Sequence, residues 1–258
     1  MVLHFYKYQG TGNDFVLIDN RLQQFPKNNT KLVASLCDRK FGIGADGLIL
    51  LENDDLSDFN MVYYNADGNE GSLCGNGGRC TVAFARQLNI IVDETTFNAV
   101  DGVHKASIKN GVISLQMQNV AEIKEKTNYA FLDTGSPHHV QLVKNLKDFK
   151  VFEEGKKLRY GLYGKSGSNI NFVQPIQEAV FAVRTYERGV EDETLSCGTG
   201  VTAVALAMHN AGKVVTEEVD ILTEGGKLQV RFRKEEGVYK DIYLVGPAEQ
   251  VFKGEFEC

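Results

Sequence analysis

Two short stretches of sequence, Cys74-Gly75-Asn76-Gly77 and Cys197-Gly198-Thr199-Gly200, lie 123 residues apart and decide how the chain is organised. Two further glycine-containing pairs have a counterpart at the same offset: Thr11-Gly12 corresponds to Thr134-Gly135, and Asp101-Gly102 corresponds to Glu224-Gly225. Three coincidences at one offset indicate two homologous halves, residues 1–122 and 123–249. The sequence does not decide whether the last strand, 250–258, returns to the first half.

Hydrophobic periodicity predicts that each Cys-Gly-x-Gly turn opens an apolar helix, over residues 75–88 and 198–209. In both halves two strands joined by a glycine turn come earlier, and a meander of strands with tight glycine turns follows the helix. A third helix is predicted over 30–39, with Asn29 or Thr30 as its N-cap. We therefore expect an α/β (α+β) fold, mostly of strands.

Length and charge exclude several classes of protein. The chain has 258 residues and a net charge of −6, which disfavours a nucleic-acid binder because such proteins usually carry a basic excess. No run approaches the ~18 to 20 apolar residues of a membrane span, and the N-terminus lacks the pattern of a signal peptide. Five widely spaced cysteines without a CxxC pair predict neither a disulfide scaffold nor a structural zinc site. We expect a cytoplasmic protein that binds no nucleic acid and no membrane.

The chemistry of the chain is expected at Cys74 and Cys197. A helix N-terminus offers unpaired N–H groups and the positive end of the helix dipole, which stabilise anions and favour a thiolate. One such cysteine would be interpreted as a small buried apolar residue. Two in repeat register suggest an acid and a base that act on opposite faces of one carbon, as inversion of a stereocentre requires. We expect Cys37 and Cys80 to be packed, and Cys258 to have no role.

At these residues the sequence resembles the diaminopimelate epimerase family, and the resemblance covers essentially the whole chain. The segments that carry it are Gly10-Thr11-Gly12-Asn13-Asp14-Phe15, Asn65-Ala66-Asp67-Gly68, Cys74-Gly75-Asn76-Gly77-Gly78-Arg79-Cys80, Gly135-Ser136-Pro137-His138, the Asn169 segment, Glu187-Arg188-Gly189 and Cys197-Gly198-Thr199-Gly200.

The resemblance implies an isomerase that interconverts LL- and meso-2,6-diaminopimelate, for lysine and peptidoglycan precursors. Neither pyridoxal phosphate nor a metal is implied. It further implies that Cys74 and Cys197 are the acid–base pair and that each half is a curved, mostly antiparallel sheet around a central helix. The active-site cleft would lie between the halves, and the protein would be a homodimer whose ligand is the small-molecule substrate.

The resemblance also implies roles for other residues. Ligands of the distal amino and carboxylate groups would be Asn13, Asn65, Asn169 and Arg188. Residues that present helix-start N–H groups to the reacting carboxylate would be Gly75, Asn76, Gly198 and Thr199. Residues that tune the cysteines or hold the α-amino group would be His138 and Glu187.

The chain departs from the family pattern at three places. Ser136 stands where many members have asparagine, and Gly47 stands where some have glutamine, so two polar contacts with the substrate are expected to differ. The segment 190–193 is one residue longer than in many members, and we expect only a longer loop there.

Three alternatives stay open at this point. A proline or hydroxyproline racemase also uses two cysteines. Its substrate has no distal charged end, however, so it would not need Asn65, Asn169 and Arg188 as ligands of such an end. A binding protein for a small anion could use the helix starts alone, although paired thiols argue against it. A metal site built from Cys74, Cys197 and His138 is the weakest of the three.

Overall fold

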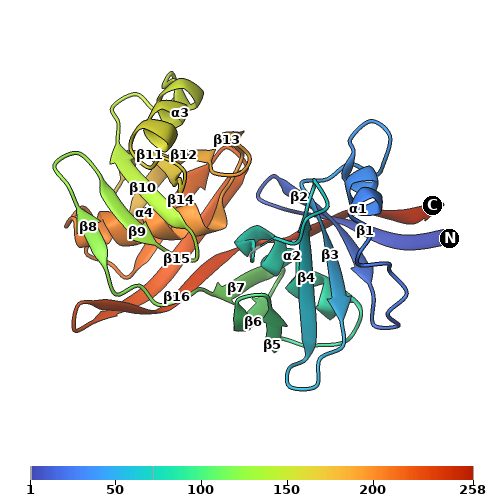
Figure 1. Cartoon of the computed structure of the whole chain (residues 1–258). Coiled ribbons are helices and arrows are strands. Elements are labelled where there is room, and N and C mark those ends of the chain that lie inside the picture. The colour runs from blue at the N-terminus through green and yellow to red at the C-terminus, as the bar shows by residue number, and fades with distance from the viewer. Residues whose placement is uncertain (1, 72, 258) are drawn as a thin grey trace. The chain divides into compact units, whose positions relative to one another are not determined.

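The computed structural model describes residues 2–71 and 73–257, and these form two compact units (Figure 1). The first unit contains the described residues up to Leu115 together with those from Gly246 onward, and the second contains Gln116–Val245. Compactness divides the chain after residue 115, whereas the sequence repeat divides it after 122. Because compactness concerns packing and a repeat concerns ancestry, the homologous halves 1–122 and 123–249 stay a prediction.

The first unit is built on one twisted sheet. Its strands, in sheet order, are β17 (Glu249–Glu257), β1 (Val2–Gly10), β2 (Asn13–Asp19), β3 (Gly47–Glu52), β4 (Phe59–Asn65), β5 (Glu94–Ala99), β6 (Gly102–Lys109) and β7 (Val112–Gln116). The pairs β2–β3 and β4–β5 are parallel, and the other neighbours are antiparallel. The last strand of the chain therefore belongs to the sheet that the first strand begins.

The second unit repeats this plan. Its strands, in sheet order, are β8 (Ile123–Glu125), β9 (Ala130–Asp133), β10 (Pro137–Leu142), β11 (Asn169–Gln177), β12 (Val180–Glu187), β14 (Glu218–Thr223), β15 (Gly226–Glu235) and β16 (Val238–Pro247), and β13 (Asp192–Thr194) forms a hairpin with β12. Its parallel pairs, β10–β11 and β12–β14, occupy the same places in the order of strands. The predicted α/β (α+β) fold of two similar, mostly antiparallel sheets is confirmed.

Each parallel pair needs a crossover connection, and each crossover carries a helix. The helices are α1 (Thr30–Cys37), α2 (Gly75–Gln87), α3 (Val151–Gly161) and α4 (Gly198–Asn210). The three helices predicted from the sequence are confirmed to within two residues, and Asn29 is the N-cap of α1, with its side chain accepting from the N–H of Leu32 at 3.0 Å. Helix α3 was not predicted, because it lacks a side-chain cap and contains Gly155 in its middle.

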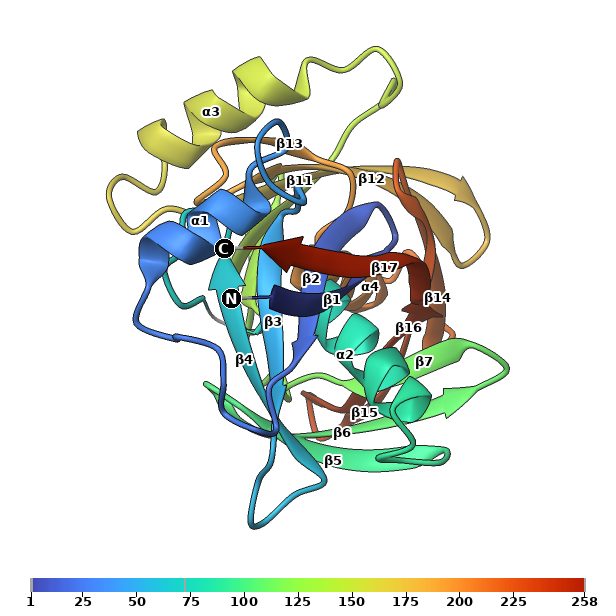
Figure 2. The same cartoon turned by 90° about the vertical axis from the view of Figure 1, so that its right-hand side faces the viewer.

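Helices α2 and α4 are the central helices of their units. Ten of the thirteen residues of each are buried, as expected for a helix with protein on nearly every side. Helix α2 contacts β1, β2, β3, β4 and β6, and this sheet curves around it (Figure 2). Helix α4 contacts the corresponding strands of its own sheet. Helix α1 packs on the opposite face of the first sheet through Val33 and Leu36.

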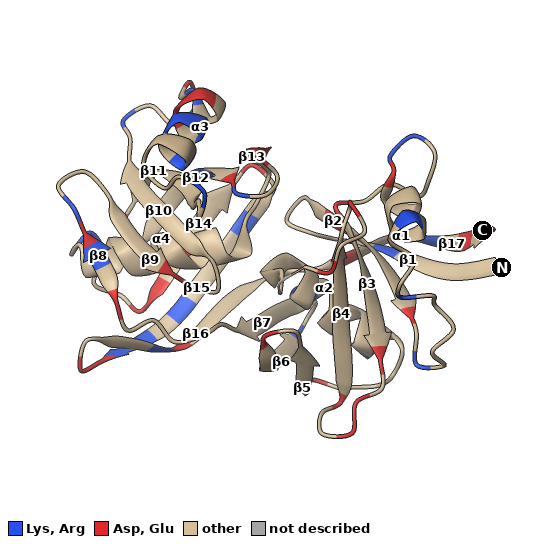
Figure 3. Cartoon of the chain, viewed as in Figure 1, with Lys and Arg blue, Asp and Glu red and all other residues tan. Residues whose placement is uncertain are grey.

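Acidic residues, lysine and arginine occur in both units, whereas helix α4 contains none of these (Figure 3). On β14 and β15, for example, Lys227 pairs with Asp220 at 2.7 Å. Among the described residues, no helix has the length and apolarity that crossing a membrane would require.

Candidate functional site

Cys74 is the N-cap residue of α2, and its extended backbone leads directly into the helix. Its Sγ donates to the Oδ1 of Asn13 at 3.4 Å, and the side-chain amide of Asn76 donates to the same oxygen at 3.4 Å. Gly77 lies in the first turn, where a Cβ would be in ordinary contact with the Cβ of Cys74 at 3.5 Å and in tight contact with the Cδ1 of Ile49 at 3.1 Å. The structure thus brings Asn13, Cys74, Gly75 and Asn76 together at the helix start.

A network of charged side chains orients the side chain of Asn13. The amide of Asn13 donates to the carboxylate of Asp46, and Arg39 bridges Asp46 and Asp14 at 2.7 Å each. The buried ammonium of Lys7 also pairs with Asp14 at 2.7 Å. Burial works to raise the pKa of Asp14, but hydrogen bonds from Arg39 and Lys7 outweigh it and hold the pKa at about 2. The ionised network fixes the orientation of the Asn13 amide, because its nitrogen must face Asp46.

Asn65 is the last residue of β4 and lies opposite Gly47 of β3 in the sheet register. Its side chain is exposed, and its backbone N–H closes a turn by donating to the carbonyl of Asn69 at 2.9 Å. The space that a side chain at Gly47 would need is occupied by the ring of Tyr63 and the backbone carbonyl of Tyr64, and no sequence pattern singles out Tyr63.

A buried arginine, also not selected from the sequence, supports the start of α2. Arg79 is fully buried and donates to the hydroxyl of Thr11 at 2.7 Å and to the carbonyls of Gly75 and Pro247 at 3.4 Å. Burial lowers the pKa of Arg79 to about 10, so its guanidinium stays charged at neutral pH. Its fixed positive charge lies beside Cys74 and adds to the positive end of the helix dipole.

Cys197 is the N-cap residue of α4, as Cys74 is of α2. Its Sγ lies 3.5 Å from the hydroxyl of Thr199, and that hydroxyl lies 2.9 Å from the Nε2 of His138. His138 is fully buried whereas Thr199 is partly exposed, so the histidine end of this chain of contacts is shielded from water.

The orientation of Asn171, at the base of this chain, follows from its neighbours. One end of its amide lies 2.9 Å from the backbone carbonyl of His139, which can only accept, so that end is the NH2 group. The same nitrogen lies 3.2 Å from the Nδ1 of His138, and its Oδ1 accepts from the hydroxyl of Thr185 at 3.0 Å. The Nδ1 of His138 must therefore act as an acceptor.

This arrangement sets the protonation of His138. Burial lowers the pKa of His138 to about 3, and the positive charge of Arg188 contributes in the same direction, so the imidazole is neutral. With Nδ1 accepting, the single ring proton is on Nε2, which donates to the oxygen of Thr199. The hydroxyl proton of Thr199 is then available to the sulfur of Cys197.

Ser136, Asn169 and Arg188 form a second polar cluster in this unit. The amide of Asn169 donates to the Ser136 hydroxyl at 3.0 Å, and its Oδ1 accepts from the backbone N–H of Arg188 at 2.8 Å. The guanidinium of Arg188 reaches the Ser136 hydroxyl at 3.3 Å and the carbonyl of Ser166 at 3.0 Å. Glu187, at the end of β12, accepts from the hydroxyl of Thr194 at 2.8 Å.

The remaining described cysteines are packed, as predicted. Cys37 and Cys80 are buried, and burial raises the pKa of Cys37 to about 12 and also raises that of Cys80. Neither is suited to form a thiolate near neutral pH. Cys258 lies outside the described residues.

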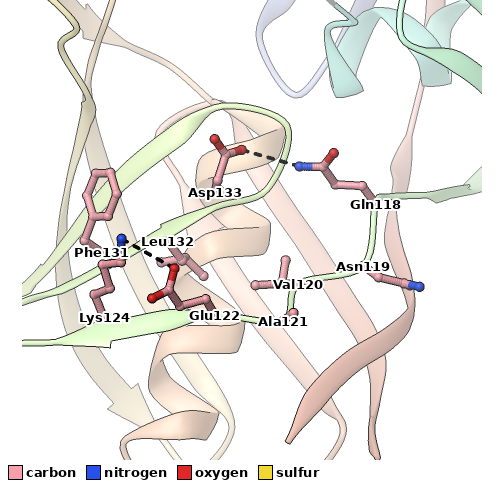
Figure 4. A pocket seen from close by; sticks show the side chains of 9 residues that line it. All are labelled: Gln118, Asn119, Val120, Ala121, Glu122, Lys124, Phe131, Leu132 and Asp133. Atoms are coloured by element: carbon pink, nitrogen blue, oxygen red, sulfur yellow. Dashed lines mark hydrogen bonds and ion pairs between the residues drawn. The ribbon is translucent and has the colours of Figure 1, made fainter.

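One pocket of about 350 Å³ lies beside β8 and β9 of the second unit (Figure 4). Gln118 and Asp133 face each other across it at 3.4 Å, and Lys124 pairs with Glu122 at 3.4 Å. None of its lining residues is among the predicted site residues, so we assign no function to it.

Comparison with known proteins gives consistent results along the chain. The family model described as diaminopimelate epimerase matches residues 5–125 and 130–251. The chain is 62% identical over 250 residues to a diaminopimelate epimerase of Flavobacterium psychrophilum, which covers 96% of this chain and 98% of that protein. It is 38% identical over 273 residues to the diaminopimelate epimerase of Aquifex aeolicus, with 98% and 97% covered.

Two solved structures resemble the chain in fold. One is a phenazine biosynthesis protein of the PhzF family from Bacillus anthracis, with a TM-score of 0.81, 14% identity and 100% of both chains covered. The other is a hydroxyproline epimerase from Agrobacterium vitis, with a TM-score of 0.73, 13% identity, and 98% and 92% covered. At such low identity the likeness concerns the fold alone.

Proposed function

Because this chain belongs to the diaminopimelate epimerase family and is thus an isomerase, we propose that it interconverts LL- and meso-2,6-diaminopimelate with Cys74 and Cys197 as the acid–base pair. One observation carries the proposal: each of the two cysteines is the N-cap of the buried central helix of its unit. A racemase of proline or hydroxyproline is not favoured, because only the fold supports it.

The proposed reaction transfers two protons and needs no cofactor or metal. The thiolate of one cysteine removes the α-proton, and the electron pair of the broken C–H bond stays on the substrate as an enolate-like anion. The thiol of the other cysteine then protonates the opposite face and becomes the thiolate. Atoms and charge balance, and the reverse reaction exchanges the two roles. This scheme requires the two sulfurs to face opposite sides of one carbon.

Helix-start N–H groups would stabilise the anion that forms. We expect Gly75 and Asn76 on one side, and Gly198 and Thr199 on the other, to offer these groups to the reacting carboxylate. The buried charge of Arg79 would strengthen the first of these helix starts.

At Cys197 the thiolate would be further stabilised by a directed hydrogen bond. Neutral His138 donates to Thr199, which leaves the hydroxyl proton of Thr199 for the sulfur. We therefore propose that His138 acts on Cys197 through Thr199. Glu187 is expected to hold the α-amino group.

The distal end of the substrate is expected to bind to Asn13, Asn65, Asn169 and Arg188. The contact between Arg188 and Ser136 supports this role, because it holds a planar cation beside the Asn169 amide. Ser136 would then position Arg188 in place of a direct amide contact. We further propose a cytoplasmic homodimer that supplies precursors of lysine and peptidoglycan, which rests on the family resemblance.

Proton NMR of LL-diaminopimelate with reduced protein in D2O tests the proposal. We expect deuterium at the α-carbon together with formation of the meso isomer, and no conversion by Cys74→Ala or Cys197→Ala. Turnover of proline without turnover of diaminopimelate would replace the proposal with the racemase, and near-normal conversion by either cysteine variant would exclude the two-base mechanism.

A further inference from the structure

Tyr63 lies on the face of the first sheet that carries the site residues. Alternate residues of a strand share a face, so Met61, Tyr63 and Asn65 of β4 point to the same side. That side is the one covered by α2, because a Cβ on Gly77 would lie 3.5 Å from both the Cε of Met61 and the Cβ of Cys74. Tyr63 thus shares a face with Asn65 and the start of α2.

Two glycines make room for the Tyr63 ring. A Cβ on Gly47 would lie 2.5 Å from its Cε2 and 3.0 Å from its hydroxyl oxygen, as well as 2.5 Å from the backbone carbonyl of Tyr64, and a Cβ on Gly71 would lie 2.8 Å from its Cδ1 and Cε1. Neither glycine is among the described residues with positive φ, so space, not backbone conformation, requires them. The ring therefore leans from β4 across β3, and its hydroxyl stands above Gly47.

This position places the hydroxyl among residues expected to bind substrate. Gly47 lies opposite Asn65 on β4 and opposite Phe15 on β2, and the rings of Phe15 and Tyr63 meet edge to face at 6.1 Å. Asn13 lies two residues before Phe15 and on the same face of β2. The hydroxyl thus stands above the strand that separates Asn13 from Asn65.

We propose that the hydroxyl of Tyr63 hydrogen-bonds the charged distal end of diaminopimelate and is a specificity-determining residue. The inference rests on the proposed function and extends it. A phenol can donate to a carboxylate or accept from an ammonium group. Because the distal end does not react, the contact would contribute equally to binding of the substrate and of the transition state.

Tyr63→Phe tests the inference, because it removes the hydroxyl and keeps the ring between the two glycines. We expect KM for LL-diaminopimelate to rise about ten-fold to a hundred-fold, while kcat changes less than about threefold. The matched control is Tyr64→Phe, on the same strand but within the core on the opposite face, which should keep the KM of the unchanged protein. Thermal unfolding of each variant checks that the fold is intact.

A double-mutant cycle with Gly71→Ala separates the hydroxyl from general packing. The nearest atoms to the added methyl are side-chain atoms, the Tyr63 ring at 2.8 Å and the Asn65 amide at 3.0 Å, whereas a methyl on Gly47 would also meet the backbone carbonyl of Tyr64. Gly71→Ala should therefore displace the ring and raise KM, and combining it with Tyr63→Phe should raise KM no further than the larger single effect. An unchanged KM in Tyr63→Phe, or multiplicative effects in the double variant, would overturn the inference while turnover by the unchanged protein upholds the proposed function. An unchanged protein without turnover would overturn both.

Discussion

Replacing Thr199 by valine tests the link between His138 and Cys197 with a small change of shape. Valine keeps the branched side chain and the backbone N–H of the helix start, and it substitutes a methyl group for the hydroxyl. Two contacts disappear together: the 2.9 Å hydrogen bond from the Nε2 of His138 and the 3.5 Å contact with the Sγ of Cys197. The substitution therefore affects both stability and reactivity, by amounts that can be assessed separately.

The loss of stability comes from His138. Its ring is fully buried, and in Thr199→Val its Nε2–H faces a methyl group, so a buried donor is left unsatisfied. Such a group costs about 1–3 kcal/mol, and the free energy of unfolding should fall by that amount. Chemical denaturation at pH 7.5 measures it.

The change in reactivity comes from Cys197. A hydrogen bond to a charged group contributes about 1.5–3 kcal/mol, and the long contact here places the effect near or below the lower end of that range. About 1.4 kcal/mol corresponds to a factor of ten, or one pH unit. We expect the pH at which iodoacetamide alkylates Cys197 at half its maximal rate to rise by about one unit. Below this midpoint, kcat/KM of Thr199→Val should be about ten-fold lower than that of the unchanged protein.

The assay follows alkylation of the Cys197 peptide by mass spectrometry, so that other cysteines do not contribute. Thr202→Val is the matched control, because Thr202 lies in the same helix and its buried hydroxyl donates to the carbonyl of Gly198 at 3.0 Å. It should leave the alkylation profile unchanged. If Thr199→Val also leaves the profile unchanged while it destabilises the protein, the hydroxyl does not serve the thiolate and the proposed link to His138 is wrong.

Three further predictions concern pH, the buried arginine and oxidation. The pKa of His138 is about 3 in the folded protein but near 6.5 in an unfolded chain, so between these pH values the unfolded state binds more protons. The free energy of unfolding should therefore fall as the pH drops from 6.5 toward 3. Denaturation at several pH values measures this dependence, which should be weaker in His138→Gln. Arg79→Leu should lower the free energy of unfolding by about 3 kcal/mol or more, because three acceptors lose their donor. Arg86→Leu, in the last turn of the same helix, is the control and should lower it by under about 0.5 kcal/mol. Equal losses in the two variants would contradict the role of Arg79. Mild oxidation should inactivate the enzyme by joining Cys74 to Cys197, and dithiothreitol should restore it; full activity after oxidation would count against the proximity that the two-base mechanism needs.

Local patterns predicted the elements whose signals are themselves local. The helices that follow Cys74 and Cys197 begin at glycines and continue as apolar runs, and Asn29 is a standard cap, so all three predicted helices are present in the structure. Helix α3 could not be found in this way. Its packing on Tyr186 requires Gly155, because a Cβ there would lie only 2.4 Å from the Cβ of Tyr186, and such a contact is not visible in the sequence.

The same limit applies to the site. The roles expected for the cysteines and asparagines came from repeat register and family resemblance, which single out residue types at fixed spacings. Tyr63 and Asn171 matter through partners that lie far along the chain: Gly47 for the first, and His138 and Thr185 for the second. Only the register of strands β3, β4, β10, β11 and β12 brings these partners together.

The pairing of β17 with β1 has a consequence for synthesis on the ribosome. Residues Val2 to Gln9 are made well before their partners, Glu249 to Glu257, so the first sheet lacks this strand until residues 249–257 have been made. The second unit is a single continuous stretch, Gln116–Val245, and can complete its sheet before the first. The sheet whose first strand is synthesised earlier is therefore completed later. A nascent chain arrested before residue 249 should protect β10 and β11 from proteolysis while β1 stays accessible.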